Sequence, residues 1–211
     1  MYRHGQFEQP QTVLAMKMHR PSVRGFTLIE LVVTIAIVAV LAMTAVPSLV
    51  TYKRNSDLTS ATNTLIAALN AARGEALKRG LNALVVPTAN GTSWNAGLVV
   101  FVDSVQNKTY DASTDVTVMT QDPVPSFITV TGGGSTTAAA STPFIMFDSS
   151  GYSKDKSAAF VPATLTLVRN DVSSADAWKE TRIIIVARSG RVRSCRPAVA
   201  NDSNCNSGLP Q

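Results

Sequence analysis

Hydrophobic and polar residues are arranged in three different patterns along the chain, and each pattern predicts a different kind of element. From Phe26 to Pro47 the sequence is almost entirely apolar, and Glu30 is its only charged residue. A helix of this length spans about 31 Å at ~1.5 Å per residue, which matches the hydrocarbon core of a bilayer. The first pattern therefore predicts a hydrophobic helix of membrane-spanning length over residues 26–50.

The second pattern follows Pro47, where apolar residues recur at spacings of three and four. These residues are Leu58, Ala61, Leu65, Leu69, Ala72 and Ala76. Such spacing places them on one face of an amphipathic helix, with the polar residues largely elsewhere. Gly80 follows Lys78 and Arg79 and is a suitable C-terminal stop. We expect residues 51–80 to continue the first helix, with a bend at Pro47, and to pack on the rest of the protein.

The third pattern consists of short runs rich in β-branched and aromatic residues, separated by turn residues. The runs are 81–86, 97–103, 116–119, 127–130, 144–147, 163–168 and 181–187. They predict a β-rich globular domain over residues 81–211 and an α+β fold, in which the long helix packs on antiparallel sheets. The segment TGGGSTTAAAST (131–142) is predicted to be a flexible loop of low complexity.

Composition and charge restrict the possible functions. The chain has 211 residues, of which 45% are hydrophobic and 16% are charged. Its net charge is +5, but from Phe26 onward 15 basic residues oppose 13 acidic ones, which leaves +2. Both histidines, His4 and His19, precede the apolar run, so the rest of the chain has neither histidine-based catalysis nor a histidine metal site. We expect a non-enzymatic protein without metal or cofactor.

Carboxylate catalysis is the remote alternative, and Asp103, Asp111 and Asp115 show no spacing that singles them out. The two cysteines, Cys195 and Cys205, are too few for a structural zinc site and do not form a C-x-x-C motif. In an exported protein, the expected arrangement is one disulfide that closes a short C-terminal loop.

The residues that flank the apolar run predict its orientation. Basic residues precede it and few follow it at once, which favours a cytoplasmic N-terminus and export of the chain beyond Pro47. Its alanines lie three apart, at 36, 39, 42 and 45, so no A-x-A signal-peptidase site is present. We expect the segment to be retained.

The stretch RGFTLIELVVTIAIVAVLAMTAVP resembles the class III signal of type IV pilins and of the pseudopilins of type II secretion. The resemblance implies that residues 1–25 are a leader, which prepilin peptidase cleaves between Gly25 and Phe26. It also implies N-methylation of Phe26 and roles in assembly for Glu30 and Pro47. The leader is long for this family, and a start at Met16 or Met18, instead of Met1, would give a more usual length.

Three later stretches resemble the GspH/FimT branch of minor pilins, whose members include FimT-like and FimU-like proteins. They are SWNAGLVVFVD (93–103), FDSSGYS (147–153) and RIIIVARSGRVRSC (182–195). The resemblance implies a type IV pilin-like fold with a C-terminal disulfide loop. The implied function is that of a minor type IV pilin, and the alternative is a GspH-type pseudopilin of type II secretion.

The implied partners are prepilin peptidase, other major and minor pilins or pseudopilins, and the inner membrane before assembly. The implied location is the inner membrane, crossed once with the C-terminal domain in the periplasm, and then the pilus or pseudopilus. Pilus genes or secretion genes beside the coding gene would separate the two readings.

The isolated charge of Glu30 then has a physical explanation. A carboxylate in an apolar segment costs several kcal/mol unless a cation neutralises it. Cleavage would create an α-amino group on Phe26, and the resemblance implies that Glu30 of an incoming subunit attracts this group on a neighbour. The alternative is that Glu30 is a polar residue at the membrane interface.

A cluster of arginines near the C-terminus suggests a second role. Its members are Arg188, Arg191, Arg193 and Arg196, with Arg182 nearby. In a strand, Arg191 and Arg193 point to the same face about 6.6 Å apart, which is close to the spacing of successive phosphates. A Gly-Arg-x-Arg element also resembles that of DNA-binding FimT-like pilins in natural transformation. We expect sequence-independent DNA binding with a salt slope of roughly −3; the alternative is a basic edge that prevents aggregation.

Overall fold

A computed structural model describes residues 25–88, 91–133, 137–200 and 202–205 of the chain. The chain divides into two compact units, Met1–Val46 and Pro47–Gln211. Helix α1 (Leu28–Arg79) includes residues of both units and contains Pro47. The predicted leader lies outside the described residues except for Gly25, as do the three possible start methionines.

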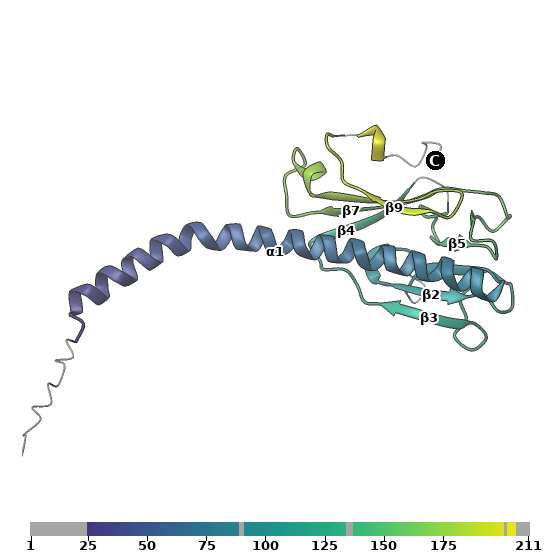
Figure 1. The fold of residues 1–211 in the computed structure, drawn as a ribbon, viewed down its shortest axis with the longest axis horizontal. Coiled ribbons are helices and arrows are strands. Elements are labelled where there is room, and N and C mark those ends of the chain that lie inside the picture. Colours follow the sequence, from purple (N-terminus) through teal and green to yellow (C-terminus); the bar gives the residue numbers. More distant parts are fainter. Residues whose placement is uncertain (1–24, 89–90, 134–136, 201, 206–211) are drawn as a thin grey trace, which may run out of the picture. The chain divides into compact units, whose positions relative to one another are not determined.

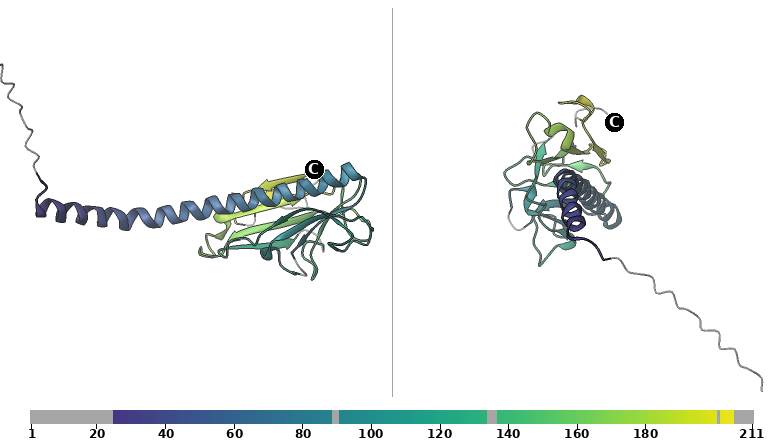
Figure 2. Two further views of the ribbon diagram at one scale, coloured as in Figure 1. Left: turned by 90° about the horizontal axis from the view of Figure 1, so that it is seen from below. Right: turned by 90° about the vertical axis from the view of Figure 1, so that its left-hand side faces the viewer.

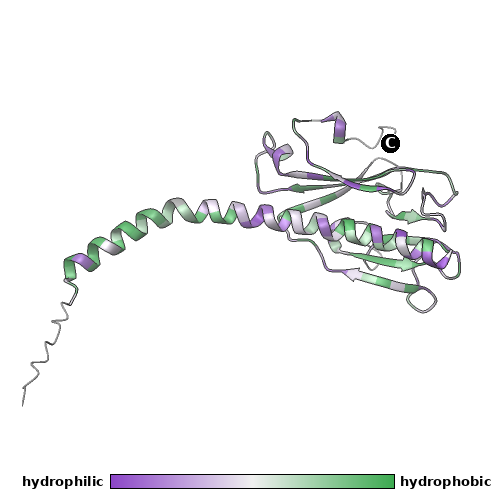
Figure 3. Cartoon of the chain, viewed as in Figure 1, coloured by the Kyte–Doolittle hydropathy of each residue, from purple (hydrophilic) through white to green (hydrophobic). Residues whose placement is uncertain are grey.

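In the first unit, the residues from Leu28 onward form the beginning of α1, and those whose side chains are described there are exposed. Figure 3 shows that apolar residues dominate this part of the helix, whereas polar and apolar residues alternate in its later turns. The helix is long and apolar enough to cross a membrane. This agrees with the predicted membrane-length segment.

In the second unit, two antiparallel sheets follow α1 (Figure 1). Sheet A has the strand order β3-β2-β1-β5-β6, and sheet B has the order β4-β7-β8-β9. Sheet A consists of β1 (Ala83–Pro87), β2 (Leu98–Val102), β3 (Val116–Gln121), β5 (Ile145–Phe147) and β6 (Ser153–Lys154). Sheet B consists of β4 (Ile128–Gly133), β7 (Ala163–Arg169), β8 (Thr181–Val186) and β9 (Val192–Cys195). Three short 3-10 helices complete the described elements: η1 (Trp94–Ala96), η2 (Ala177–Glu180) and η3 (Ser203–Cys205).

One face of the later part of α1 packs against both sheets, which confirms the predicted amphipathic helix (Figure 2). The predicted apolar positions are at most 4% exposed, apart from Ala61, which is partly buried. Thr62 is also buried on the helix, and its hydroxyl donates to the carbonyl of Leu58 at 2.7 Å. The sheets contribute alternate residues of β1, β2, β4, β5, β7 and β8 to the same core.

The end of α1 follows from its sequence. Gly80 has φ +68°, a left-handed conformation that glycine adopts without steric cost. Its amide donates to the carbonyl of Ala76 at 2.9 Å, which satisfies one of the free carbonyls at the helix end. The predicted stop at Gly80 is therefore confirmed.

The predicted flexible loop over residues 131–142 is wrong for residues 131–133, which belong to β4, whereas residues 137–142 form turns and bends. Strand β4 includes residues as far as Gly133, and Thr137 and Ala138 are buried. The indole nitrogen of Trp94 donates to the carbonyl of Ala138 at 2.9 Å. Glycine is needed at position 132, because an added Cβ would lie 1.8 Å from that carbonyl oxygen. The low-complexity sequence concealed a close backbone packing that small residues permit.

Two glycine turns join sheet A, sheet B and the helix. Gly151 lies in the turn between β5 and β6, Gly190 lies in the turn between β8 and β9, and both have positive φ. A Cβ on Gly190 would lie 1.8 Å from the carbonyl oxygen of Gly151. Arg73 of α1 donates to the carbonyl of Gly151 at 3.0 Å and to that of Ser189 at 3.3 Å. The glycines of the FDSSGYS and RSGRVR stretches thus serve packing.

A second junction lies at the other end of β8, where an arginine is buried. Arg169 is 3% exposed and forms a forked pair with Asp171, with N–O distances of 2.9 and 2.6 Å. Asp171 also accepts from Arg54 of α1, and Arg169 donates to Asn55 at 2.9 Å. The backbone of Asp171 is exposed, but its side chain is only 17% exposed. The Arg169 guanidinium lowers the pKa of the Asp171 carboxyl from 3.8 to about 2. Burial opposes this shift, and the hydrogen bond from Arg54 adds to it.

Gly190→Ala is expected to lower the free energy of unfolding of a chain of residues 52–211 by more than about 2 kcal/mol. The new Cβ would clash with the Gly151 carbonyl. Alanine would also have to adopt φ +76°, a left-handed conformation that is costly for a residue with a Cβ. Gly74→Ala is the matched control, because nothing lies within 4 Å of its Cβ position on α1. It should raise stability by about 0.5–1 kcal/mol. Equal effects of the two changes in urea unfolding would contradict the proposed close packing.

Asp171→Asn is expected to cost about 2 kcal/mol of unfolding free energy at pH 7 in the same chain. The folded-state pKa lies below the unfolded value of 3.8, so this stabilisation is complete above pH 5 or so and is lost as the pH falls toward about 2. Urea unfolding over this range should show the wild type and the variant converging in acid. Asp176→Asn, which removes an exposed partner of Lys179, should barely change stability. A difference between Asp171→Asn and wild type that persists at the lowest pH would contradict this role.

Candidate filament-assembly and surface sites

Glu30 lies in the first turn of α1 and is hydrogen-bonded to Thr27. Its Oε2 accepts from the backbone amide of Thr27 at 2.9 Å and from the Thr27 hydroxyl at 3.0 Å. The amide of Glu30 in turn donates to the Thr27 hydroxyl at 3.2 Å. This reciprocal pattern is a capping box, which the sequence Thr-x-x-Glu specifies at a helix start. This capping box was not among the predictions, although Thr27-Leu28-Ile29-Glu30 carries its sequence signal.

The capping box leaves part of the carboxylate available. Both bonds from Thr27 are accepted by Oε2, and Oε1 of Glu30 accepts none from the described residues. The large apolar side chains around it are exposed, with Phe26 at 89% and Leu28 at 80%. Glu30 can therefore hold the helix start of its own chain and still accept a cation from outside through Oε1.

The other residues of the predicted processing site lie close to this capping box. Gly25 and Phe26 precede α1 and are exposed, so the bond between them is accessible in the described structure. Pro47 is the first residue of the second unit and lies within α1. The role of each in processing or assembly remains a prediction.

The C-terminal disulfide joins Cys195 at the end of β9 to Cys205 in η3, with a Cα–Cα distance of 5.4 Å. Cys205 is 4% exposed. Asp202 organises the loop between them by accepting from the amides of Ala198 and Asn204 at 2.9 and 3.0 Å. The closed loop predicted from the two cysteines is thus part of the fold.

The four predicted DNA-binding arginines do not form one cluster. Arg188 and Arg191 are exposed on the turn between β8 and β9, and neither guanidinium has a partner among the described residues. Arg193 is half-buried in β9 and donates to the carbonyl of Asn204 at 3.3 Å. Its side chain therefore supports the disulfide loop, because one of its nitrogens is already committed to that loop.

Arg196 lies at the opposite end of the β8–β9 hairpin from the turn. Its guanidinium donates to the carbonyl of Lys179 at 3.3 Å. Burial, and next the positive charge of Arg196, lowers the pKa of Arg182 below its ordinary value. The five residue-to-residue steps from Arg191 to Arg196 cover about 16 Å in an extended chain. Arg191 and Arg196 therefore lie at opposite ends of β9 and do not present one joint surface.

Two exposed aromatic residues lie beside the arginine-bearing turn. The amide of Ser153 donates to the carbonyl of Arg188 at 3.0 Å, which places the neighbouring Tyr152 next to the turn. Tyr152 is 44% exposed and forms an edge-to-face pair with Phe160, with ring centroids 5.3 Å apart. This pair is far from the arginines in the sequence, so only the fold reveals an aromatic surface beside them.

The three aspartates considered for catalysis have structural roles. Asp103 is buried and accepts from the amides of Asn107 and Lys108 at 3.0 and 2.9 Å. Asp115 accepts from the amides of Ser104 and Asp111. These bonds hold the connection between β2 and β3. Among the described residues, no group of three or more His, Cys, Asp or Glu side chains could hold a metal ion.

Comparison with protein families gives two matches. The family described as "Type II transport protein GspH" matches residues 61–190, and the one described as "Prokaryotic N-terminal methylation motif" matches residues 20–46. The first covers the later part of α1 and most of both sheets. The second covers the predicted cleavage site and the apolar start of α1. No curated protein matches the chain.

Similar solved structures include pilin-like proteins of both kinds. The type IV minor pilin FimU of Pseudomonas aeruginosa is 16% identical, with a TM-score of 0.48, over 67% of this chain and 90% of FimU. The minor pseudopilin EpsH of the Vibrio cholerae type II secretion system is 13% identical, with a TM-score of 0.47, over 70% of this chain and 99% of EpsH.

Proposed function

Because the chain belongs to the GspH family, whose members are non-enzymatic pilin or pseudopilin subunits, we propose that it is a minor pseudopilin of a type II secretion system. The observation that carries this proposal is the match of the GspH family to residues 61–190. From the sequence alone, a minor type IV pilin was the first interpretation and a pseudopilin was the alternative. The description of the family favours the second reading.

The location and the processing of the chain follow from its N-terminal motif. The methylation motif over residues 20–46 implies processing by prepilin peptidase and assembly with other pilin-like subunits. The hydrophobic helix anchors the chain in the inner membrane before it enters the pilus or pseudopilus. In the proposal, the peptidase cleaves between Gly25 and Phe26, and the new amino group of Phe26 is then methylated.

Assembly is proposed to use the free oxygen of Glu30. In a membrane or in the apolar centre of a filament, this carboxylate is costly unless it meets a cation. The methylated amino group on Phe26 of a neighbouring subunit is such a cation. The capping box with Thr27 supports this role, because it fixes the carboxylate at the helix start and leaves Oε1 available. This ion pair would thus fix how far one apolar helix is shifted along its neighbour in the filament.

Glu30→Gln is expected to leave leader cleavage unchanged and to abolish recruitment of the chain into the filament. Glutamine can still accept from Thr27, but it cannot neutralise a positive amino group. In a strain that lacks the native chain, the variant should fail to restore protein secretion and should remain in the membrane fraction, as judged by immunoblotting. Glu75→Gln in the later part of α1, where Glu75 is paired with Arg79, is the matched control and should restore secretion. Full secretion with Glu30→Gln would contradict the assembly mechanism. If the native chain restores piliation and has no effect on secretion, a type IV pilus is favoured instead.

A second candidate function, sequence-independent DNA binding, is favoured by Arg188 and Arg191. Both are exposed on one turn and have no side-chain partner in the described part of the chain, so forked contacts to phosphates are possible there. Tyr152 and Phe160 add an exposed aromatic surface beside them, on which an unpaired base can stack. Single strands are therefore favoured over duplexes. Because Arg193 and Arg196 are engaged by backbone carbonyls, we expect about two phosphate contacts and, for a single strand, a salt slope of roughly −1.4.

Arg188→Ala with Arg191→Ala should abolish the salt-dependent binding of a labelled oligonucleotide by residues 52–211, measured as fluorescence anisotropy. Tyr152→Ala should weaken binding to the single strand more than binding to the duplex, because it removes stacking. Lys53→Ala with Lys156→Ala removes the same charge from other exposed sites and should retain most of the binding. Absence of binding by the wild type at low salt would contradict the proposed DNA binding.

A further inference from the structure

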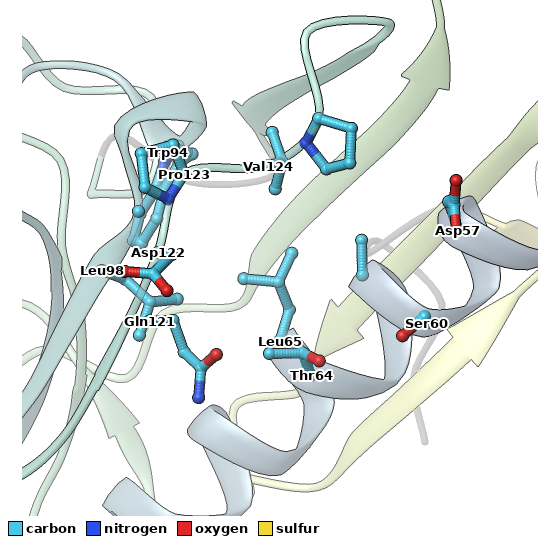
Figure 4. Close-up of a pocket in the computed structure, with 13 residues that line it drawn as sticks. Asp57, Ser60, Thr64, Leu65, Trp94, Leu98, Gln121, Asp122, Pro123 and Val124 are labelled. Carbon is cyan, nitrogen blue, oxygen red and sulfur yellow. The ribbon is translucent and has the colours of Figure 1, made fainter. Parts of the chain in front are cut away.

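A groove of about 260 Å³ lies between α1 and the segment that follows β3 (Figure 4). Its helix side carries Asp57, Ser60 and Thr64, which are three and four residues apart and so lie on one face of α1. Residues from Gln121 to Pro125 form the opposite side. The groove belongs entirely to the second unit, so its shape is independent of the membrane-length segment.

The inner wall of the groove is apolar and is held in place. Leu65, Trp94 and Leu98 contribute to it and are at most 4% exposed. Asn95 holds the outer segment by accepting from the amide of Val124 at 3.2 Å and from that of Val130 at 2.6 Å. Pro123 and Pro125 further restrict the backbone there. The groove is therefore preformed.

Each side of the groove carries a carboxylate without a partner. Asp57 on α1 and Asp122 after β3 form neither a hydrogen bond nor an ion pair through their side chains in the described part of the chain. Every other acidic side chain there has at least one such partner, as Glu75 has in Arg79 and Asp148 has in Lys154. The only two unpaired carboxylates among the described residues thus line the same groove, and none of the described residues supplies a cation for them.

We propose that this groove receives a lysine or arginine side chain from a neighbouring pilin-like subunit. The methylenes of such a side chain can lie against Leu65 and Trp94 while its charged end reaches one of the two carboxylates, which lie on opposite sides of the groove (Figure 4). Charge complementarity thus sets the chemistry of the partner, and the apolar wall sets its length. The inference rests on the proposed role as a filament subunit, since it supplies the partner that the two unpaired carboxylates lack.

Photo-crosslinking of the full chain in cells that carry its own assembly system tests this directly. A benzoylphenylalanine at Ser60 faces the groove, and the same probe at Asn63, which does not line it, is the positional control. The expected result is an adduct from Ser60 with a different pilin-like subunit, mapped by mass spectrometry to a peptide that carries lysine or arginine. Asp57→Lys with Asp122→Lys should reduce its yield about five- to tenfold, because two attractions become repulsions.

Asp111→Lys with Asp176→Lys makes the same change in net charge away from the groove and should leave the adduct unchanged. An equal adduct yield in the groove variant, or no adduct in assembled filaments, would overturn the inference. It would also be overturned if the adducts formed only with a second copy of this chain or only with lipid, or if the mapped peptide carried no basic residue. Recruitment of the chain into filaments, measured by co-fractionation, distinguishes failure of the groove proposal from failure of the proposed function. Normal recruitment without the adduct overturns the groove alone, whereas absence of recruitment overturns both.

Discussion

Burial of one face of α1 by two sheets is the interaction on which the globular unit depends. Leu58, Leu65 and Leu69 fill the space between helix and sheets, and Ala72 and Ala76 let the sheets approach closely near the helix end. Because a sheet with one apolar face is not stable alone, sheets A and B both depend on this helix. Arg73 and Arg54, which flank the same face, add polar contacts to the turns and to β7–β8.

The earlier part of α1 has the same apolar character without the same cover. Its side chains are exposed in the isolated chain, so lipid or other subunits must supply their surroundings. Such surroundings do not solvate a charge, so the carboxylate of Glu30 needs partners there. The capping box with Thr27 satisfies one of its oxygens and leaves the other available to a cation. One chain therefore uses apolar burial twice, once within its own fold and once toward the filament.

The features that could be predicted from the sequence are those with local periodicity. The α1 stripe, its stop at Gly80 and seven of the strands follow from spacing and turn chemistry alone. The features that could not be predicted depend on contacts between distant segments. The glycines of 131–142 suggested a loop, because nothing local shows that Trp94 reaches Ala138. The separation of Arg191 from Arg196 likewise depends on the pairing of β8 with β9.

The central claim is that this chain is processed into a filament subunit whose first residue is Phe26. The intact mass of the chain purified from the membrane and filament fractions measures this directly. The account predicts the mass of residues 26–211 with one disulfide and one added methyl group on the N-terminal amine. A mature chain that begins at any other residue, or one that begins at Phe26 but carries no methyl group, would contradict it.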